Sequence, residues 1–248
     1  MDIGKGQLAY IADVCVAPGG TAPYKGMLIL CAGSGRNAIL VYRQEPATGH
    51  LRLLSTAAMP GGGDDGPRHV VPSPCGGYVY SVTEHTSLVD VWRVVGEGER
   101  VTLAHHLRDS ILPPRQAPSW RAYRGDTVRL SPDGQSLFAT TRGKARGTRG
   151  YVTVWRIDAT HGAMQWRRST SYEAQTSGGK AHAIEFAPRY DADVAPTSLD
   201  YAVLTDDEEG YITVLQWDGH DLQDAARLCL PALASGEPQG ASHAVWLS

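Results

Sequence analysis

The residues best placed for chemistry recur at fixed distances from four prolines, Pro18, Pro74, Pro132 and Pro188. The position six residues before each proline, and its counterpart near the C-terminus, holds Ala12, Arg68, Asp126, His182 and His243. Glu84 and Arg142 stand ten residues after two of these prolines. Together with Arg124 and Lys180, they predict a mainly cationic surface that contains one or two carboxylates. Such a surface suits a small ligand with several negative charges, because charge-assisted hydrogen bonds to arginine are strong.

The four prolines mark an internal repeat, since they lie 56, 58 and 56 residues apart. In the second unit, the apolar runs predict strands near 68–73, 78–83, 88–94 and 101–107, separated by turn-forming segments. Four short strands per unit are typical of a β-propeller blade, in which the first strand lines a central channel. The predicted fold class is all-β, a propeller of four-stranded antiparallel blades. Equivalent positions in successive blades then form a ring around the channel.

The sequence predicts a single propeller domain over residues 1–248, with about four blades and one extra strand. The blades are expected at about 10–57, 67–108, 124–172 and 180–231, and the terminal strand at 243–248. The last strand lacks chain to complete a blade, so we expect an open arc, with a closed four-bladed ring as the alternative. Apolar side chains exposed at the two end blades would favour self-association. Trp92, Trp155 and Trp217, equivalent in their third strands, are expected to be buried between blades.

Composition and charge argue against several classes of function. With 42% hydrophobic and 20% charged residues the chain is expected to fold, and its 28 glycines and 15 prolines favour turns over long helices. A net charge of −3 lacks the basic excess that a nucleic-acid partner requires. Neither an apolar run of ~18 residues nor a secretion signal is evident, which predicts a cytoplasmic protein without a membrane partner. The four cysteines form no CxxC pair, so we expect reduced thiols rather than metal ligands.

The motifs around these positions resemble those of lactonase-type seven-bladed propellers, and most closely the fungal 3-carboxy-cis,cis-muconate lactonizing enzymes. In chain order, the resemblance is carried by Gly66-Pro-Arg-His69, Tyr78-Val-Tyr-Ser-Val-Thr-Glu84, Tyr123-Arg-Gly-Asp126, Thr140-Thr-Arg-Gly143, Thr176-Ser-Gly-Gly179, Thr205-Asp-Asp-Glu-Glu-Gly-Tyr211 and Ala244-Val-Trp246. It corresponds to the C-terminal two-thirds of that family, so about three N-terminal blades would be absent. The early His-Gly of the family falls on Ala12-Asp13.

The resemblance implies cycloisomerisation of 3-carboxy-cis,cis-muconate in aromatic (β-ketoadipate) catabolism, without a metal or another cofactor. A carboxylate oxygen adds to a conjugated double bond, and a proton goes to the carbon beside another carboxylate. The residues that would bind this polycarboxylate substrate are Arg68, Arg124, Arg142 and Lys180. Glu84 or His182 would supply the proton as a general acid. We expect the three arginines to share one cleft, with Glu84 at its edge.

Other interpretations of the same residues stay open. A 6-phosphogluconolactonase-like hydrolase would use the arginines to hold a phosphate. A truncated, non-catalytic propeller paralogue would carry the charges as solvated loop residues. His182 equally suits a structural role, with hydrogen bonds between neighbouring first strands, and His243 suits that role better than a catalytic one.

Overall fold

The computed structural model describes residues 9–14, 28–157, 164–189 and 199–247, which form four four-stranded antiparallel sheets. The first sheet consists of β1 (Ala9–Val14), β2 (Leu28–Gly33), β3 (Ala38–Gln44) and β4 (Leu51–Ala58). The second consists of β5 (Pro67–Pro72), β6 (Tyr78–Thr83), β7 (Leu88–Val95) and β8 (Thr102–Ser110). Each sheet is built from strands that follow one another in the chain.

The third sheet consists of β9 (Tyr123–Leu130), β10 (Ser136–Gly143), β11 (Tyr151–Ile157) and β12 (Met164–Glu173). The fourth consists of β13 (Ile184–Phe186), β14 (Asp200–Thr205), β15 (Tyr211–Trp217) and β16 (Leu222–Cys229). Three short 3₁₀ helices lie in the connections: η1 (Ser34–Arg36), η2 (Gly98–Arg100) and η3 (Ala117–Ala122). In the described parts of the chain, no helix is long and apolar enough to cross a membrane.

The same turn joins the first two strands of the second and third sheets. After β5, the Ser73 hydroxyl accepts a hydrogen bond from the backbone N–H of Tyr78 at 3.0 Å. After β9, the Ser131 hydroxyl accepts one from the N–H of Ser136 at 2.9 Å. A glycine with φ near +70° follows three residues after each serine, a conformation that glycine adopts without a steric penalty. The repeated Ser-Pro-x-Gly pattern therefore fixes the same hairpin in two blades.

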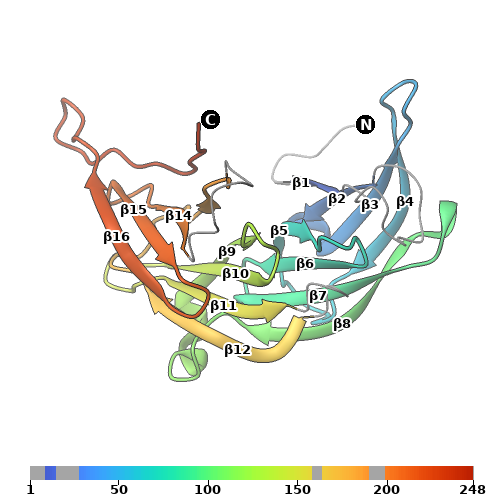
Figure 1. The fold of residues 1–248 in the computed structure, drawn as a ribbon, viewed down its shortest axis with the longest axis horizontal. Coiled ribbons are helices and arrows are strands. Elements are labelled where there is room, and N and C mark those ends of the chain that lie inside the picture. The colour runs from blue at the N-terminus through green and yellow to red at the C-terminus, as the bar shows by residue number, and fades with distance from the viewer. Residues whose placement is uncertain (1–8, 15–27, 158–163, 190–198, 248) are drawn as a thin grey trace.

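The four sheets are arranged in an open arc, with β1–β4 at one end and β13–β16 at the other (Figure 1). The first strands of neighbouring sheets contact one another in the order β1, β5, β9 and β13. The fourth strands of adjacent sheets also contact one another in two of the three junctions. This radial stacking of consecutive four-stranded sheets is the architecture of a β-propeller. The predicted fold class is confirmed.

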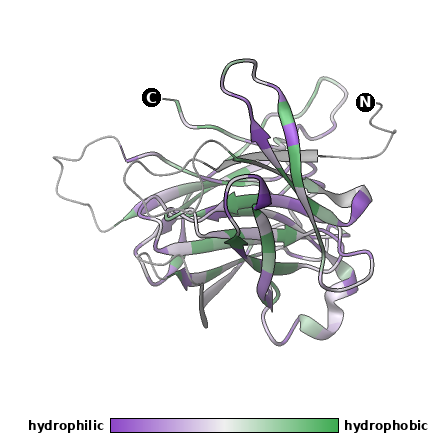
Figure 2. Ribbon diagram, turned by 90° about the vertical axis from the view of Figure 1, so that its right-hand side faces the viewer, coloured by the Kyte–Doolittle hydropathy of each residue, from purple (hydrophilic) through white to green (hydrophobic). Residues whose placement is uncertain are grey.

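Apolar cores fill the junctions between sheets, and each contains one of the three equivalent tryptophans. Hydrophobic stretches lie mostly within the stacked strands, and hydrophilic ones at their ends (Figure 2). Trp92, Trp155 and Trp217 are only 1%, 0% and 3% exposed. Each packs against the preceding sheet, as Trp217 does edge-on to Phe138 with ring centroids 5.1 Å apart. The prediction that these tryptophans are buried between blades is confirmed.

The end of the chain does not form the strand predicted at 243–248. Residues 243–247 form no strand, and residue 248 lies outside the described residues. The segment instead runs beside the fourth sheet, where the Trp246 indole N–H donates to the backbone oxygen of Glu185 at 3.1 Å. A strand needs a ladder of backbone partners. The apolar pattern of the segment predicted a strand, but no neighbouring strand pairs with the segment in the structure. The prediction was therefore wrong.

The two end sheets each turn an apolar face away from the stack. Alternate residues of β14 pack on the third sheet, so Tyr201 points outward, and it is 39% exposed. Leu228 of β16 is 57% exposed. At the other end of the arc, Leu53 pairs with Tyr42 of β3, and both Leu51 and Leu53 are 47% exposed. Both ends therefore expose part of an apolar sheet face.

Candidate functional site

Two sheets bring the predicted site residues together at one end of their strands. Glu84 directly follows β6, and Arg124 lies opposite Arg142 in the β9–β10 pairing. The backbone N–H of Gly125 donates to the Glu84 oxygen at 2.9 Å and so ties β9 to the end of β6. A Cβ atom at Gly125 would lie 2.2 Å from the Thr83 oxygen, so this close approach needs glycine.

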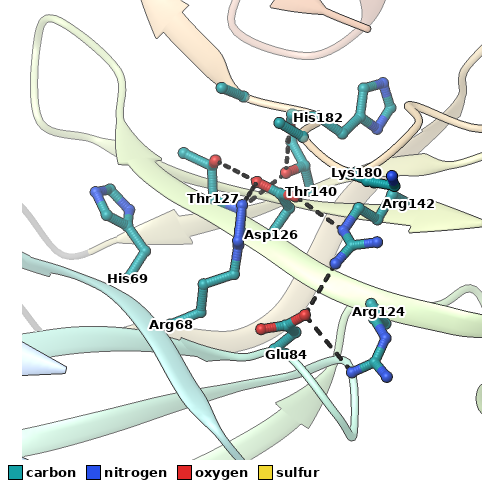
Figure 3. Close-up of polar contacts among 12 residues, drawn as sticks. Arg68, His69, Glu84, Arg124, Asp126, Thr127, Thr140, Arg142, Lys180 and His182 are labelled. Carbon is teal, nitrogen blue, oxygen red and sulfur yellow. Dashed lines mark hydrogen bonds and ion pairs between the residues drawn. The ribbon is translucent and has the colours of Figure 1, made fainter. Parts of the chain in front are cut away.

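Five charged side chains form a continuous ion-pair chain across these sheets, in the order Arg124, Glu84, Arg142, Asp126 and Arg68 (Figure 3). Glu84 Oε1 lies 2.8 Å from Arg142 Nη2 and 3.5 Å from Arg124 Nη1. Asp126 forms ion pairs with two guanidinium groups, with Oδ2 at 3.2 Å from Arg142 Nε and Oδ1 at 3.1 Å from Arg68 Nη2. Three arginines against two carboxylates leave one net positive charge. The three arginines thus meet in one ion-pair chain, with Glu84 between two of them, although only Arg68 of the three is among the lining residues of the cavity described below.

Asp126 is the most buried member of this ion-pair chain and is only 2% exposed. The Thr127 hydroxyl donates to its Oδ1 at 3.0 Å. A buried carboxylate is stable only when opposite charges and hydrogen bonds compensate it. Asp126 therefore fixes the positions of two guanidinium groups.

A cavity of about 420 Å³, the channel cavity, lies beside the ion-pair chain. Its wall is formed by Arg68, His69, Asp126, Thr127, Arg129, Ala181, Ala183, Ser242 and His243. These residues come from β5, β9, the segment before β13 and the C-terminal segment. The volume lies in the range of small-molecule sites, and the wall combines few charged groups with small side chains.

His69 and Arg129 are cavity residues that we did not single out from the sequence. Arg129 Nε donates to Glu185 Oε2 at 2.9 Å, and its Nη1 lies 2.7 Å from His69 Nε2. The Val128 N–H donates to His69 Nδ1 at 3.2 Å. Burial, followed by the charge of Arg129, lowers the pKa of His69 from its usual 6.5 to about 3. His69 is therefore neutral near pH 7.

Irregular strand pairing explains why both His69 and its neighbour Arg68 reach the cavity. The β5–β6 register shifts between Pro67 and His69, and the β9 register shifts across the segment that holds Asp126 and Thr127. In a regular strand, consecutive side chains point to opposite faces. A bulge breaks this alternation and re-aims side chains. The motif Gly66-Pro-Arg-His69 was a signal for His69, whereas nothing in the repeat spacing indicated Arg129.

His182 occupies a different place from the one its repeat position predicts. Its side chain is 1% exposed, and Nδ1 donates to the Thr141 oxygen at 2.8 Å. It lines a separate cavity of about 10 Å³, and a Cβ atom at Gly150 or Gly178 would collide with its ring. Burial lowers the pKa of His182, so it is neutral near pH 7. The structure brings Ala181 and Ala183, rather than His182, to the channel cavity.

Two lysines extend the positive charge beyond the ion-pair chain. Lys180 is exposed beside Arg142 (Figure 3), and its backbone N–H donates to Asp207 Oδ1 at 2.6 Å. Lys144, which the sequence analysis did not select, directly follows β10. Partial burial, and then Arg124, Arg142 and Arg121, lower the pKa of Lys144. This shift reports a positive potential at the end of β10.

Two further expectations concern the family's early His-Gly position and metal ligands. The family's early His-Gly falls on Ala12 and Asp13, and the side chains of these two residues lie outside the described part of the structure. Within the described ranges, no group of three or more His, Cys, Asp or Glu is placed to hold a metal ion.

The stacked sheets and the arginine-lined cavity on their first strands define a β-propeller with a candidate binding site on its channel side. Residues 21–177 match the family model described as "Lactonase, 7-bladed beta-propeller". Because this match covers more than half of the 248 residues, the chain belongs to the lactonase family of seven-bladed propellers.

Three comparisons give the similarity in detail. The chain is 33% identical over 194 residues to muconate cycloisomerase 1 of Cutaneotrichosporon cutaneum, covering 77% of this chain and 49% of that protein. It is 26% identical over 204 residues to carboxy-cis,cis-muconate cyclase of Neurospora crassa, covering 81% and 51%. The solved periplasmic gluconolactonase of Pseudomonas aeruginosa shares the fold, with a TM-score of 0.63, 17% identity, and coverage of 87% and 54%. The chain thus spans about half the length of the curated relatives it matches.

Proposed function

We propose that this protein is a cycloisomerase that lactonizes 3-carboxy-cis,cis-muconate. The observation that carries the proposal is the convergence of Arg68, Arg124 and Arg142 beside a cavity of about 420 Å³. Relatives named for muconate and carboxymuconate cyclisation support the choice of substrate. A tricarboxylate needs several fixed cations, and an arginine cluster with a net positive charge supplies them.

The ion-pair chain suits the charge changes of this reaction. A carboxylate oxygen of the substrate forms a C–O bond to one end of a conjugated double bond, and the π bond breaks. Its electron pair moves to the carbon beside a second carboxylate, which becomes enolate-like and then takes up a proton. Arg68 and Arg142 are already fixed by Asp126 and need little rearrangement to stabilise that charge. Preorganised cations of this kind favour the transition state over the ground state.

We assign the proton transfer to Glu84, which would take up a proton from solvent before it donates one, rather than to His182. The Glu84 side chain is 20% exposed and lies between Arg124 and Arg142, where a carboxylate of the substrate would bind. A general acid must come within hydrogen-bond reach of the carbon it protonates or act through one water. His182 is enclosed by glycines and donates its Nδ1 proton to a backbone oxygen. His182 therefore supports the wall of the site and takes no direct part in the reaction.

The decisive experiment follows the ultraviolet absorbance of the conjugated diene of 3-carboxy-cis,cis-muconate as it is consumed. In an active protein, Arg142→Gln is expected to lower kcat/KM by about 10²–10³-fold, because one preorganised stabilising group is lost. Glu84→Gln is expected to lower kcat by about 10²–10⁴-fold. Arg93→Gln is the matched control, because Arg93 is exposed on β7 and lines neither cavity.

The same protein tested with 6-phosphogluconolactone separates the alternatives. Hydrolysis of this lactone, without turnover of carboxymuconate, would replace the cycloisomerase proposal by a lactone hydrolase whose arginines hold a phosphate. Turnover of neither substrate would favour a non-catalytic propeller. Equal activity of Arg142→Gln and Arg93→Gln would show that the ion-pair chain is not the active site.

A further inference from the structure

The channel cavity contains two cationic positions, of which the proposed mechanism uses one. The first is Arg68, paired with Asp126 at 3.1 Å. The second is Arg129, which lies three residues beyond Asp126 on β9. At ~3.3 Å per residue, three positions along a strand span roughly 10 Å. The two cations therefore lie at different places along the cavity wall.

Arg129 is held so that part of its guanidinium group is directed to the cavity. Glu185 accepts its Nε proton at 2.9 Å, and His69 contacts Nη1 at 2.7 Å. Within the described residues, Arg129 makes its hydrogen bonds through Nε and Nη1, and none through the third nitrogen, Nη2. The Arg129 side chain is 24% exposed, and Arg129 belongs to the cavity wall. It is thus preorganised by two partners while keeping donor capacity for a ligand.

The remaining lining residues of the cavity leave room for the body of a ligand. Ala181 and Ala183 contribute only methyl groups there, and the Thr127 hydroxyl is already donated to Asp126. Asp126 is the one carboxylate among the cavity's lining residues, and two arginines compensate it. His69 is neutral near pH 7, because its pKa is about 3. Among the described lining residues, Arg129 therefore supplies the permanent positive charge at this end of β9.

We propose that Arg129 is a second anion anchor, so that the channel cavity selects elongated ligands with an acidic group at each end. Arg68 binds one end and Arg129 the other, with the ligand's carbon chain along the alanines. This deepens the proposed function, because it rests on the cavity being the substrate site. It also explains what the Arg129–Glu185 pair does on a channel-facing surface, since an exposed ion pair alone contributes little to stability.

The test compares two ligands of equal length by isothermal titration calorimetry: adipate, with a carboxylate at each end, and hexanoate, with one. Adipate is expected to bind at least about tenfold more tightly to the unmodified protein, the effect of one added charge-assisted contact. In Arg129→Gln this preference should fall to within about twofold, while hexanoate affinity stays unchanged. Arg189→Gln is the matched control, because it breaks an ion pair with Asp200 outside the cavity wall.

Three outcomes would overturn the inference: equal affinity for the two acids, equal loss in Arg129→Gln and Arg189→Gln, or equal weakening of both acids by Arg129→Gln. Should Arg129→Gln fail to fold by circular dichroism, Arg129→Lys is measured instead and is expected to reduce the preference without abolishing it. Turnover is scored separately. A preference for adipate without turnover of carboxymuconate would overturn the proposed function and keep the second anchor, whereas turnover without the preference would do the reverse.

Discussion

The first strands of the second and third blades differ from the first strand of the fourth, although the three occupy equivalent places in the repeat. In β5 and β9 a register shift brings adjacent residues to the cavity, including Arg68 and Asp126. The strand β13 covers only Ile184–Phe186, and the preceding His182 turns into the protein interior. The first strands of these blades thus take similar backbone positions. Irregular strand pairing determines which of their side chains reach the channel.

This difference separates residues that bind from residues that support. Arg68 presents a positive charge at the cavity, and Asp126 holds it there through an ion pair. His182 instead donates a hydrogen bond to the backbone oxygen of Thr141 in the neighbouring blade. Substitutions on the two sides should therefore have different signatures. Substitution of Arg68 or Asp126 should change both charge compensation and ligand binding. Substitution of His182 should change the stability of the fold alone.

The largest effect is expected from Asp126→Ala, which leaves two partly buried guanidinium groups without their shared carboxylate. Removing one partner of a buried ion pair costs about 3–5 kcal/mol of unfolding free energy, because the remaining charge is uncompensated. Urea denaturation measures this change. Asp64→Ala is the control, since the Asp64 side chain is 80% exposed and its one ion pair within the described residues is with His85, and it should cost less than about 1 kcal/mol. Similar losses in both variants would mean that Asp126 is not a buried clamp.

A smaller loss of stability, without loss of binding, is expected from His182→Ala. The variant removes a buried ring and its hydrogen bond to Thr141, which costs about 2–4 kcal/mol of unfolding free energy. Its adipate affinity should stay within about twofold of the unmodified protein, whereas Arg68→Ala should weaken it about tenfold or more. Calorimetry on folded protein checks both values. Loss of adipate binding in folded His182→Ala would mean that His182 contributes to the binding site. The fourth blade would then not differ from the second and third in this respect.

These contrasts show which parts of the molecule could be predicted from sequence. The regular proline spacing and the Ser-Pro-x-Gly turns were sufficient to predict the blades. The equivalent positions of Trp92, Trp155 and Trp217 were sufficient to predict that these side chains are buried. The meeting of Arg68, Arg124 and Arg142 also followed from their places at first-strand entries and second-strand ends, which lie on the same face. The orientation of His182 and the presence of Arg129 did not, because they depend on bulges and on pairing across blades.

The acid side of the stability curve tests the neutral state of His69. Its pKa is about 3 in the folded protein and 6.5 in the unfolded chain, so the unfolded state binds more protons between these values. The free energy of unfolding should therefore fall as the pH drops from about 6.5 toward 3, by at most ~1.4 kcal/mol per pH unit from this group. His182, whose pKa is also lowered by burial, acts in the same direction.

Denaturation at several pH values, compared between the unmodified protein and His69→Gln, isolates this contribution. The variant should show a shallower decline below pH 6.5, while His220→Gln, at an exposed position in the β15–β16 turn, should follow the unmodified curve. Parallel curves for the unmodified protein and His69→Gln would mean that the pKa of His69 is the same in the folded and unfolded states, which would contradict its lowering by burial and by Arg129.

The smallest effect is expected at the two end faces of the arc, where we propose that copies of this chain associate. Three interior junctions are closed by a third-strand aromatic against the preceding sheet, and Tyr42 of β3 stands at the equivalent position of the first sheet. The outward face of the fourth sheet offers Tyr201 and Leu228 as the surface such an aromatic would cover. Apolar burial of this kind favours association between sheet faces.

Sedimentation over a range of protein concentrations should then show self-association, and Tyr201→Glu should weaken it by about tenfold, because a buried charge opposes the contact. Glu237→Lys, at an exposed position outside the sheet, controls for a change of surface charge. A protein that stays monomeric, melts cooperatively and does not bind a hydrophobic dye would contradict the proposal. In that case the end faces would be stable in water despite their apolar side chains. The interior junctions would then differ from the end faces in how tightly their side chains pack, rather than in how much apolar area each presents.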